Sequence, residues 1–320
     1  MERAATRSGF AALIGRPNVG KSTLLNRLTG EKLAIVSSRP QTTRTRILGV
    51  VTRPEGQIAF LDTPGVHKAT GALNKMMVQT AMHAASECDV VTFLIEAEGL
   101  KEGKPPDVGP GNRYVLDELQ RLKKPTVLVI NKIDAVKRVL LLPLIDLYRK
   151  QFSFAEVVPV SARTGDGVDA LFGILLKHMP EAPPMFEPDV FTDQAERTLV
   201  AEYVREQVLK NCRQEVPYST AIVIDHFDES EREPDGRKQK VPGLAGLVRI
   251  FATIFVERES QKAIVIGKRG AMLKEIGTAA RKSIERLLGS HVYLSLKVQV
   301  DEKWSDRPDA LRRMGYGDGN

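Results

Sequence analysis

Between residues 10 and 179, short apolar runs alternate with segments of helical period. Their apolar and β-branched content predicts buried strands at FAALIG, RILGVVTR, QIAFLD, DVVTFLIEA, TVLVIN and VVPVSA. Helical spacing occurs between them, at KSTLLNRLTG, ALNKMMVQTAMHAAS and GVDALFGILLKHM. This alternation predicts an α/β domain whose mostly parallel sheet is covered by helices on both faces. The stretch EGLKEGKPPDVGPGN at 98–112 predicts a protruding loop.

The order of elements changes after a proline-rich stretch, MPEAPPMFEPDVFTD at 179–193, which predicts a linker. A helix is expected at 194–212, followed by strands YSTAIVIDHF and LVRIFATIFVER. A short helix near 260–266, a longer one at 271–288 and a final strand VYLSLKVQV complete an α+β module in the order α-β-β-α-α-β. The charged segment between the first two strands, 228–243, predicts a mobile loop.

The predicted division of the chain follows from these patterns. We expect a first domain at 1–180, a linker at 181–193, a second domain at 194–303 and a tail at 304–320 that holds the one tryptophan, Trp304.

The sequence GRPNVGKS, residues 15–22, lies between a predicted strand and a predicted helix. It fits the phosphate-binding pattern G-x-x-x-x-G-K-[ST] in the structural context that this pattern needs. Glycines let the backbone N–H groups face a phosphate chain, and the helix N-terminus adds positive potential. Lys21 can then reach the β- and γ-phosphates of a nucleotide, and the hydroxyl of Ser22 can bind Mg²⁺. A glycine-rich turn without a ligand is the alternative.

Two further residues that suit a nucleotide site follow the third predicted strand. In FLDTPG, Asp62 ends an apolar run, and Gly65 comes three residues later. A carboxylate in this place can hold Mg²⁺ through water, and the N–H of Gly65 can meet a γ-phosphate. Taken alone, an Asp-x-x-Gly sequence is a common turn.

The base of the nucleotide is indicated by NKID and VVPVSAR, which also end predicted strands. Guanine carries two neighbouring donors, N1–H and the N2 amine, which one carboxylate can accept together, whereas adenine has no such pair. Asp134 is therefore the expected guanine selector, with Asn131 and Lys132 shaping the pocket. A backbone N–H at Ser161 or Ala162 could reach guanine O6. Ligands of open α/β sheets bind at the strand ends where these motifs lie.

Together the motifs predict a GTP site. Its expected members are Gly15, Arg16, Pro17, Asn18, Val19, Gly20, Lys21, Ser22, Thr23, Asp62, Thr63, Pro64, Gly65, Asn131, Lys132, Asp134, Ser161 and Ala162.

This arrangement resembles the translation-factor-related class of GTPases. The resemblance implies a threonine Mg²⁺ ligand in the first switch loop, SSRPQTTRTR at 37–46; we assign it to Thr43, with Thr42 as the competing choice. Many GTPases place a glutamine after the DTPG sequence to orient the attacking water, but here the residue is Val66. In related GTPases with an apolar residue there, a P-loop asparagine helps to bind K⁺. The resemblance thus implies slow intrinsic hydrolysis, with Lys21, Thr43 and Gly65 as catalytic residues, and K⁺ stimulation through Asn18.

In the second domain, AIVIGKRGAMLKEIG at 263–277 places Gly267, Lys268, Arg269 and Gly270 between two predicted helices. A G-x-x-G turn lets a nucleic-acid backbone come close, and its two cations face the phosphates; this is the loop of KH domains, which clamps about four nucleotides of a single strand. The α-β-β-α-α-β order fits the type II KH arrangement. A helix–helix turn with a solvated basic face is the alternative.

The residues around this turn extend the predicted RNA site to Ile266 and Lys274. Ile264, Ile266, Leu273 and Ile276 could floor a groove for bases, or belong partly to the core.

The composition is ordinary for a soluble globular protein, and the net charge indicates an anionic partner without identifying it. The net charge is +7, and residues 1–180 carry 25 Lys and Arg against 17 Asp and Glu, whereas 181–320 carry 22 against 23. Any RNA contact in the second half must therefore use a local patch, and 262–286 provides one, with seven basic and two acidic residues. No secretory signal or bilayer-spanning run is evident, and the two cysteines suggest reduced packing residues.

The whole chain resembles the bacterial Era family of GTPases. The resemblance lies in GRPNVGKSTLLNRLTG, RPQTTRTRILGV, LDTPG, NKID, VSAR, VERESQKAIVIGKRGAMLKEIG and ARKSIERLLGSHVYLSLKV. It implies a P-loop GTPase domain followed by a type II KH domain, with GTP or GDP, Mg²⁺ and K⁺ bound. It also implies binding to the 3′ region of 16S rRNA, a role in 30S subunit assembly, and a cytoplasmic location with peripheral association with the inner membrane. We expect a monomer.

Two other functions are compatible with the sequence. The chain could be a membrane-associated or cell-cycle GTPase for which RNA binding is incidental. It could also be an RNA-binding module with a degenerate nucleotide site, although intact Lys21, Ser22, Asp62 and Asp134 argue against that.

Overall fold

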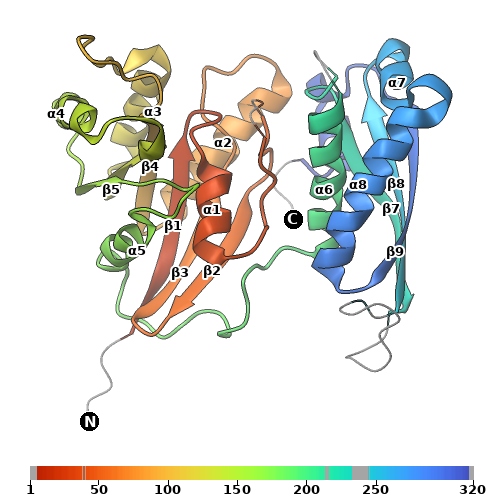
Figure 1. Cartoon of the computed structure of the whole chain (residues 1–320), viewed down its shortest axis with the longest axis horizontal. Coiled ribbons are helices and arrows are strands. Elements are labelled where there is room, and N and C mark those ends of the chain that lie inside the picture. Colours follow the sequence, from red (N-terminus) through yellow and green to blue (C-terminus); the bar gives the residue numbers. More distant parts are fainter. Residues whose placement is uncertain are drawn as a thin grey trace. The chain divides into compact units, whose positions relative to one another are not determined.

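A computed structural model describes residues 6–37, 39, 41–212, 216–232, 244 and 246–316 of the 320-residue chain. The chain divides into two compact units: Met1–Thr70 with Asn74–Asp193, and Gly71–Leu73 with Gln194–Asn320. Each unit has its own sheet, and the two are described in turn (Figure 1).

The first unit is built on a six-stranded sheet in the order β2-β3-β1-β4-β5-β6. All neighbours are parallel except β2 and β3, which pair antiparallel. The strands are β1 (Arg7–Gly15), β2 (Ile47–Arg53), β3 (Gly56–Asp62), β4 (Val90–Glu96), β5 (Thr126–Asn131) and β6 (Glu156–Pro159). The helices are α1 (Lys21–Thr29), α2 (Ala72–Glu87), α3 (Gly109–Leu122), α4 (Leu141–Arg149) and α5 (Val168–Leu176).

Two apolar layers cover the faces of this sheet, as the alternating pattern predicts. Because side chains alternate along a strand, Ala11 and Leu13 of β1 pack with α1 and α5, whereas Ala12 and Ile14 pack with α2, α3 and α4. The predicted α/β class with helices on both faces is therefore confirmed (Figure 1).

One part of the first unit differs from the sequence-based expectation. The stretch 98–112 was expected to be a loop, but its end is helical, because α3 begins at Gly109. Pro110 lies in the first turn of this helix, where proline costs no hydrogen bond and its fixed φ suits the helical backbone.

The predicted linker lies against the first sheet over part of its length. Gln57 of β3 is fully buried and accepts hydrogen bonds from the backbone N–H groups of Met185 (2.8 Å) and Phe186 (2.9 Å). The side-chain amide of Gln57 donates to the carbonyl of Phe186 at 2.8 Å. Further along, the N–H of Val50 in β2 donates to the carbonyl of Phe191 at 2.9 Å. This segment therefore continues the first unit as far as these contacts reach.

The second unit contains a three-stranded sheet in the order β7-β8-β9. β7 (Ala221–Glu231) and β8 (Leu247–Val256) are antiparallel, and β8 and β9 (His291–Val300) are parallel. The helices are α6 (Glu196–Asn211), α7 (Glu259–Ile266), α8 (Ala271–Leu288) and α9 (Pro308–Arg313). The order from α6 to β9 is the α-β-β-α-α-β order expected of a type II KH domain (Figure 1).

The structure also describes the beginning of the predicted tail and of the predicted loop at 228–243. Trp304 is fully buried and donates from its indole N–H to the carbonyl of Ser219 at 3.0 Å, so the beginning of the predicted tail packs in the second unit. The predicted loop 228–243 is strand as far as Glu231, and its residues 233–243 lie outside the described part of the chain. Cys88 and Cys212 are both buried.

Candidate functional site

The turn between β1 and α1 holds the predicted phosphate loop. Asn18 and Gly20 adopt left-handed backbone conformations, with φ of 66° and 99°. A Cβ atom at Gly20 would lie 2.2 Å from the side-chain nitrogen of Asn131, so that position requires glycine. α1 begins at the next residue, Lys21, so its free N–H groups point into the loop.

Lys21 is buried beneath this loop. Its ammonium group donates to the carbonyls of Gly15 (3.2 Å) and Arg16 (3.1 Å). Burial lowers the pKa of Lys21 to about 8, against the opposing effect of the Asp62 carboxylate. A charge in such an environment is stabilised strongly by any phosphate that enters the loop.

Three oxygen-bearing side chains from distant segments meet next to Lys21. The Ser22 hydroxyl donates to Oδ2 of Asp62 at 2.7 Å. The Thr43 hydroxyl donates to the same oxygen at 3.2 Å and lies 2.8 Å from that of Ser22. Burial raises the pKa of Asp62, whereas Lys21 and the two hydroxyls act in the opposite direction.

This cluster fits a magnesium ion. Hydroxyl and carboxylate oxygens are the ligands that Mg²⁺ takes in proteins, usually together with water and phosphate oxygens. Oδ1 of Asp62 is buried and has no hydrogen-bond partner among the described residues, which leaves a carboxylate oxygen for a ligand. Thr42, the competing threonine, instead donates to the carbonyl of Arg39 at 2.6 Å.

Gly65 and Val66 lie directly against the phosphate loop. A Cβ atom on Gly65 would be 2.7 Å from the backbone nitrogen of Pro17, so only glycine fits. The next N–H, of Val66, donates to the carbonyl of Gly15 at 3.0 Å. The Val66 side chain is 0% exposed and packs in the core, so it has neither the polar group nor the position to orient a water molecule.

The residues predicted to read the base form one hydrogen-bonded group. Asn131 donates to the carbonyl of Val19 at 2.8 Å and accepts from the N–H of Ala162 at 2.9 Å. Its amide thus ties the phosphate loop to the segment that follows β6. The hydroxyl of Ser161 donates to Oδ1 of Asp134 at 2.6 Å.

The carboxylate of Asp134 also pairs with the exposed guanidinium of Arg163. The hydrogen bond from Ser161, with the charge of Arg163, lowers the pKa of Asp134 below its usual range. An ionised carboxylate accepts hydrogen bonds only, which is the property that selection of guanine requires.

A cavity of about 460 Å³ opens at the phosphate loop, and the predicted base-reading residues Asn131, Asp134, Ser161 and Ala162 are not part of its lining. Of the predicted nucleotide residues, those that line it are Pro17, Asn18, Gly20, Lys21, Ser22, Thr23, Thr43, Gly65 and Lys132. Val19 and Thr63 instead point into the protein: Val19 packs in the core, and the Thr63 hydroxyl donates to the carbonyl of Leu13 at 2.7 Å. For those two, only backbone groups can meet a ligand.

Sequence reasoning missed several residues of this cavity. They are Ile35, Val36, Ser37, Gln41 and Glu98. Glu98 accepts a hydrogen bond from Lys132 at 2.7 Å, and its place in the glycine- and proline-rich stretch after β4 gave no signal of that pairing.

In the second unit, the two glycines of the GKRG turn serve different purposes. Gly267 has φ of 71°, and a Cβ atom there would lie 2.6 Å from the Cβ of Met272, so the fold requires this glycine. Gly270 has φ of 79°, but the space beside it is open. Lys268 and Arg269 are exposed between them. The open side at Gly270 is where a ligand's backbone can approach.

A groove of about 650 Å³ begins at this turn and runs between α8 and β9. Gly270 lies directly before α8, and spacings of three and four residues place Lys274, Gly277, Thr278 and Arg281 on one face of the helix, where all five line the groove. Two cations thus flank a stretch of small side chains. The cations can meet phosphates, and the small residues leave room for the chain between them.

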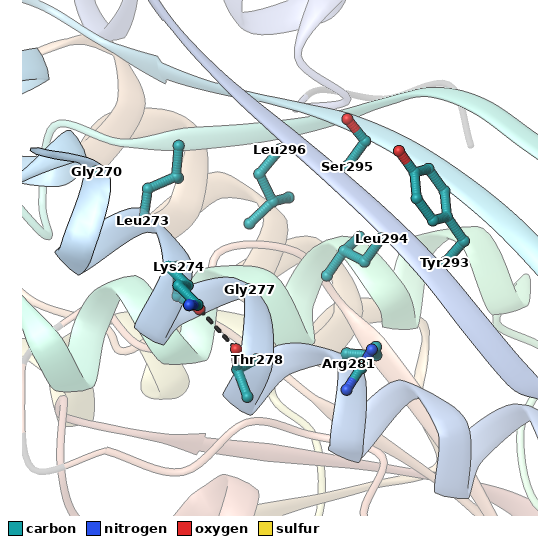
Figure 2. Close-up of a pocket in the computed structure, with 10 residues that line it drawn as sticks. All are labelled: Gly270, Leu273, Lys274, Gly277, Thr278, Arg281, Tyr293, Leu294, Ser295 and Leu296. Atoms are coloured by element: carbon teal, nitrogen blue, oxygen red, sulfur yellow. Dashed lines mark hydrogen bonds between the residues drawn. The ribbon is translucent and has the colours of Figure 1, made fainter.

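The opposite wall of the groove is formed by β9, and its floor is apolar. Figure 2 shows Leu273 of α8 and Leu294 and Leu296 of β9 pointing into it, whereas Tyr293 and Ser295 project from the other side of the strand. Sequence reasoning missed all the residues of β9, as well as Gly277, Thr278 and Arg281.

The predicted apolar contacts divide between groove and core. Leu273 lines the groove, but Ile276 is fully buried in the core. Ile264 is exposed on α7, and Ile266 is half-buried at its end, directly before Gly267.

Comparison with known proteins places these two sites in a family. The family described as 50S ribosome-binding GTPase matches residues 10–132, and the KH domain family matches residues 237–305. The GTPase Era of Geobacter metallireducens is 49% identical over 310 residues, which cover 97% of this chain and 98% of that protein. This chain belongs to the Era family of GTPases. The Era protein of Syntrophus aciditrophicus is 45% identical, over 98% of this chain and 96% of that one.

Solved structures of the Era family share the fold over the whole chain. Era in complex with MgGDPNP and nucleotides 1506–1542 of 16S ribosomal RNA has a TM-score of 0.87 and 40% identity, and the match covers 98% of this chain and 99% of that one. A variant of Aquifex aeolicus Era bound to GDP·AlF4⁻ has a TM-score of 0.87 and 39% identity, over 98% and 100%. No helix among the described residues has the length and apolar character to cross a membrane.

Proposed function

We propose that the chain is a GTP-hydrolysing switch that holds the single-stranded 3′ region of 16S rRNA in its KH groove and acts in assembly of the small ribosomal subunit. One observation carries this proposal: a relative that matches the whole chain, with a TM-score of 0.87, is bound both to a GTP analogue and to nucleotides 1506–1542 of 16S RNA. The description of the family matched by residues 10–132 mentions the 50S subunit. The full-length relative favours the 30S subunit.

The nucleotide site performs the chemistry with few groups. The N–H groups of the phosphate loop and the ammonium group of Lys21 hold the phosphates and neutralise charge that develops on them. Ser22 and Thr43, with the Asp62 carboxylate behind them, would hold Mg²⁺. That ion neutralises negative charge on the β- and γ-phosphates when bound. Asp134 selects guanine.

We assign K⁺ stimulation to Asn18. Val66 is buried and apolar, so the site lacks a side chain there to orient the attacking water. Asn18 lies in the wall of the predicted nucleotide cavity, and its backbone is left-handed with φ of 66°. A monovalent cation held there supplies positive charge next to the phosphates, as an arginine finger does in other GTPases.

The switch acts on the two loops that contact the γ-phosphate. Thr43 belongs to the segment before β2, and Gly65 to the segment after β3. Gln41, in the first of these segments, donates to the side chain of Asn74 in α2 at 2.9 Å. The segment before β2 is thus tied to α2 as well as to the phosphate loop. Loss of the γ-phosphate releases Thr43 and Gly65 together.

A binding measurement tests the RNA assignment. Fluorescence anisotropy with a labelled single-stranded oligonucleotide of the 16S rRNA 3′ end should show that Lys268→Asp/Arg269→Asp weakens binding by at least about tenfold, because two cations next to phosphates become anions. The matched control is Lys282→Asp/Arg286→Asp, which makes the same charge change on exposed residues of α8 that do not line the groove. Equal loss in both variants would mean that only overall charge matters.

The same pair of variants distinguishes a ribosomal role from the rival function. If the main partner is a membrane or a cell-cycle protein, Lys268→Asp/Arg269→Asp should leave growth intact in cells that depend on the gene. A ribosomal role predicts loss of co-sedimentation with 30S particles, without a change in GTP affinity. We further propose that the protein acts as a monomer in the cytoplasm and that any contact with the inner membrane is peripheral.

A further inference from the structure

We propose that the outer face of the β7-β8-β9 sheet is a second RNA-binding surface, on which His226, Phe251 and Tyr293 form a platform for stacking nucleobases. The platform takes the bases of a strand that leaves the KH groove around the edge formed by β9. This inference rests on the proposed RNA-binding function and extends it to a surface outside the groove.

The three rings form a row across all three strands. Strand register places His226 of β7 directly opposite Phe251 of β8, and Tyr293 of β9 opposite Arg249, two residues before Phe251 on the same face of β8. The ring centroids of His226 and Phe251 are 6.0 Å apart, and those of Phe251 and Tyr293 are 5.9 Å apart. The row is therefore continuous from one edge of the sheet to the other.

The rings lie on the face turned away from the core. Along β8, Ile250 and Ala252 are buried on either side of Phe251, and in β9 Val292 is buried beside Tyr293. Phe251 is 38% exposed and Tyr293 is 53% exposed. Cross-strand ring pairs stabilise a sheet without any ligand, but that role does not require such large aromatic surfaces in water.

The platform is continuous with the groove. Tyr293 and Ser295 belong to the groove lining, and their side chains project from the side of β9 opposite to Leu294 and Leu296 (Figure 2). A strand held between α8 and β9 thus meets Tyr293 first if it turns over the β9 edge. This continuity is the reason to assign the surface to RNA rather than to a protein partner.

The charges on this face favour contact with bases over contact with phosphates. Arg249 is paired with Glu231 at 2.6 Å, and Lys297 with Asp225 at 3.4 Å. Asp228, next to His226, adds a carboxylate whose pKa is lowered, first by its hydrogen bonds with Ser230. The cations here are already balanced by carboxylates. Binding should therefore depend on stacking, as it does on other exposed sheets that present aromatic residues to single-stranded RNA.

Binding measurements with short and long RNAs distinguish the platform from the groove. One single-stranded oligonucleotide has about four nucleotides, enough to fill a KH groove, and two longer ones extend the same sequence by several nucleotides at the 5′ or the 3′ end. Phe251→Ala should weaken binding of one longer RNA by about 5- to 150-fold, the range for loss of a stacked base. It should leave the short RNA unaffected, because Phe251 does not line the groove.

Three controls keep this test specific. Phe251→Tyr keeps a ring and should bind like the wild type. Phe255→Ala removes a ring from the same face of the same strand, outside the row, and should have no effect. The fold-loss caused by Phe251→Ala should be the same at low and high salt, whereas the loss caused by Lys268→Asp should shrink as salt rises.

Three outcomes would overturn the platform. The first is equal affinity of wild type and Phe251→Ala for every RNA. The second is an equal loss for short and long RNAs, which would show a distorted groove. The third is a concentration-dependent dimer, in sedimentation velocity, that Phe251→Ala abolishes, since the face would then belong to a second copy of the chain. If the wild type binds none of the RNAs, the groove assignment itself fails, which is a distinct result.

Discussion

The hydroxyl oxygens of Ser22 and Thr43 lie 2.8 Å apart, although 21 positions separate them in the chain. Both hydroxyls also donate to Oδ2 of Asp62. The phosphate loop, the segment before β2 and the end of β3 are thus joined at one point. A ligand that binds there acts on all three segments at once, which is the requirement for a nucleotide switch.

This geometry gives a test of the magnesium ligand. Thr43→Ala should weaken binding of a GTP analogue relative to GDP by about tenfold or more, because a hydroxyl next to a charged site is lost. Thr42→Ala is the matched control and should have little effect, since that hydroxyl donates to the carbonyl of Arg39. Titration of both variants with Mg²⁺, in the presence of the nucleotide, measures these effects. A larger loss in the Thr42 variant would transfer the role to that residue.

Lys21 should control both affinity and its dependence on pH. Lys21→Ala should weaken GTP binding by about 100-fold or more, because hydrogen bonds to two charged groups are removed. In the free protein the pKa of Lys21 is about 8, and bound phosphates raise it. Wild-type affinity should therefore be full below pH 8 and fall as the pH rises above 8, by at most about tenfold per unit. A flat profile between pH 7 and 9 would contradict this, and the alanine variant should be flat.

Asp134 should determine which base is accepted. Asp134→Asn replaces an acceptor by a group that also donates, which suits xanthine better than guanine. We expect the variant to prefer xanthosine triphosphate in a competition assay. Asp166→Asn, a nearby exposed carboxylate that pairs with Arg138, should keep the preference for guanine. If the Asp134 variant does the same, this residue is not the selector.

Hydrolysis should depend on the monovalent cation through Asn18. The wild type should hydrolyse GTP faster in K⁺ than in Na⁺ at equal ionic strength. Asn18→Gly should remove the difference, because glycine tolerates the positive φ but offers no ligand oxygen. GTP affinity serves as the control and should change little. Equal rates of the wild type in the two salts would remove the K⁺ assignment.

The contacts between Gln57 and the linker should contribute to stability. Gln57→Ala leaves two part-buried N–H groups and one carbonyl of residues 185–186 without this partner, so unfolding of the first unit should become easier by about 2 kcal/mol. Urea unfolding measures this, and limited proteolysis should cut near Met185 more rapidly. Gln120→Ala, on the exposed side of α3, should change neither. Unchanged proteolysis in the Gln57 variant would mean that other contacts hold the segment.

The nucleotide half could largely be predicted from sequence, because its signals are local. Apolar runs of strand length ended at Asp62 and Asn131, so both side chains had to lie at the carboxyl edge of one parallel sheet, on either side of the phosphate loop. The start of α3 at Gly109 could not be predicted in this way. Glycine and proline there indicate a turn, and only the packing of Val115 and Leu119 against the sheet shows that a helix follows.

The other features could not be predicted because they depend on residues that lie far apart in the sequence. The linker contacts depend on Gln57, which lies 128 and 129 residues before its backbone partners, and a proline-rich stretch gives no sign of them. In the KH unit, the turn was found from its glycines. Leu294 was missed because the sequence does not reveal which strand lies next to α8, whereas Arg281 could have been found by extending the helical spacing from Lys274.

The central claim is that GTP-controlled binding to the 3′ end of 16S rRNA takes place in the KH groove. Ultraviolet crosslinking of the tagged protein in its own cells, next to Lys268→Asp/Arg269→Asp, tests it most directly. We predict crosslinks concentrated at the 3′ end of 16S rRNA and absent in the variant. Crosslinks scattered over many RNAs, or unchanged in the variant, would contradict the account and assign the nucleotide switch to a different partner.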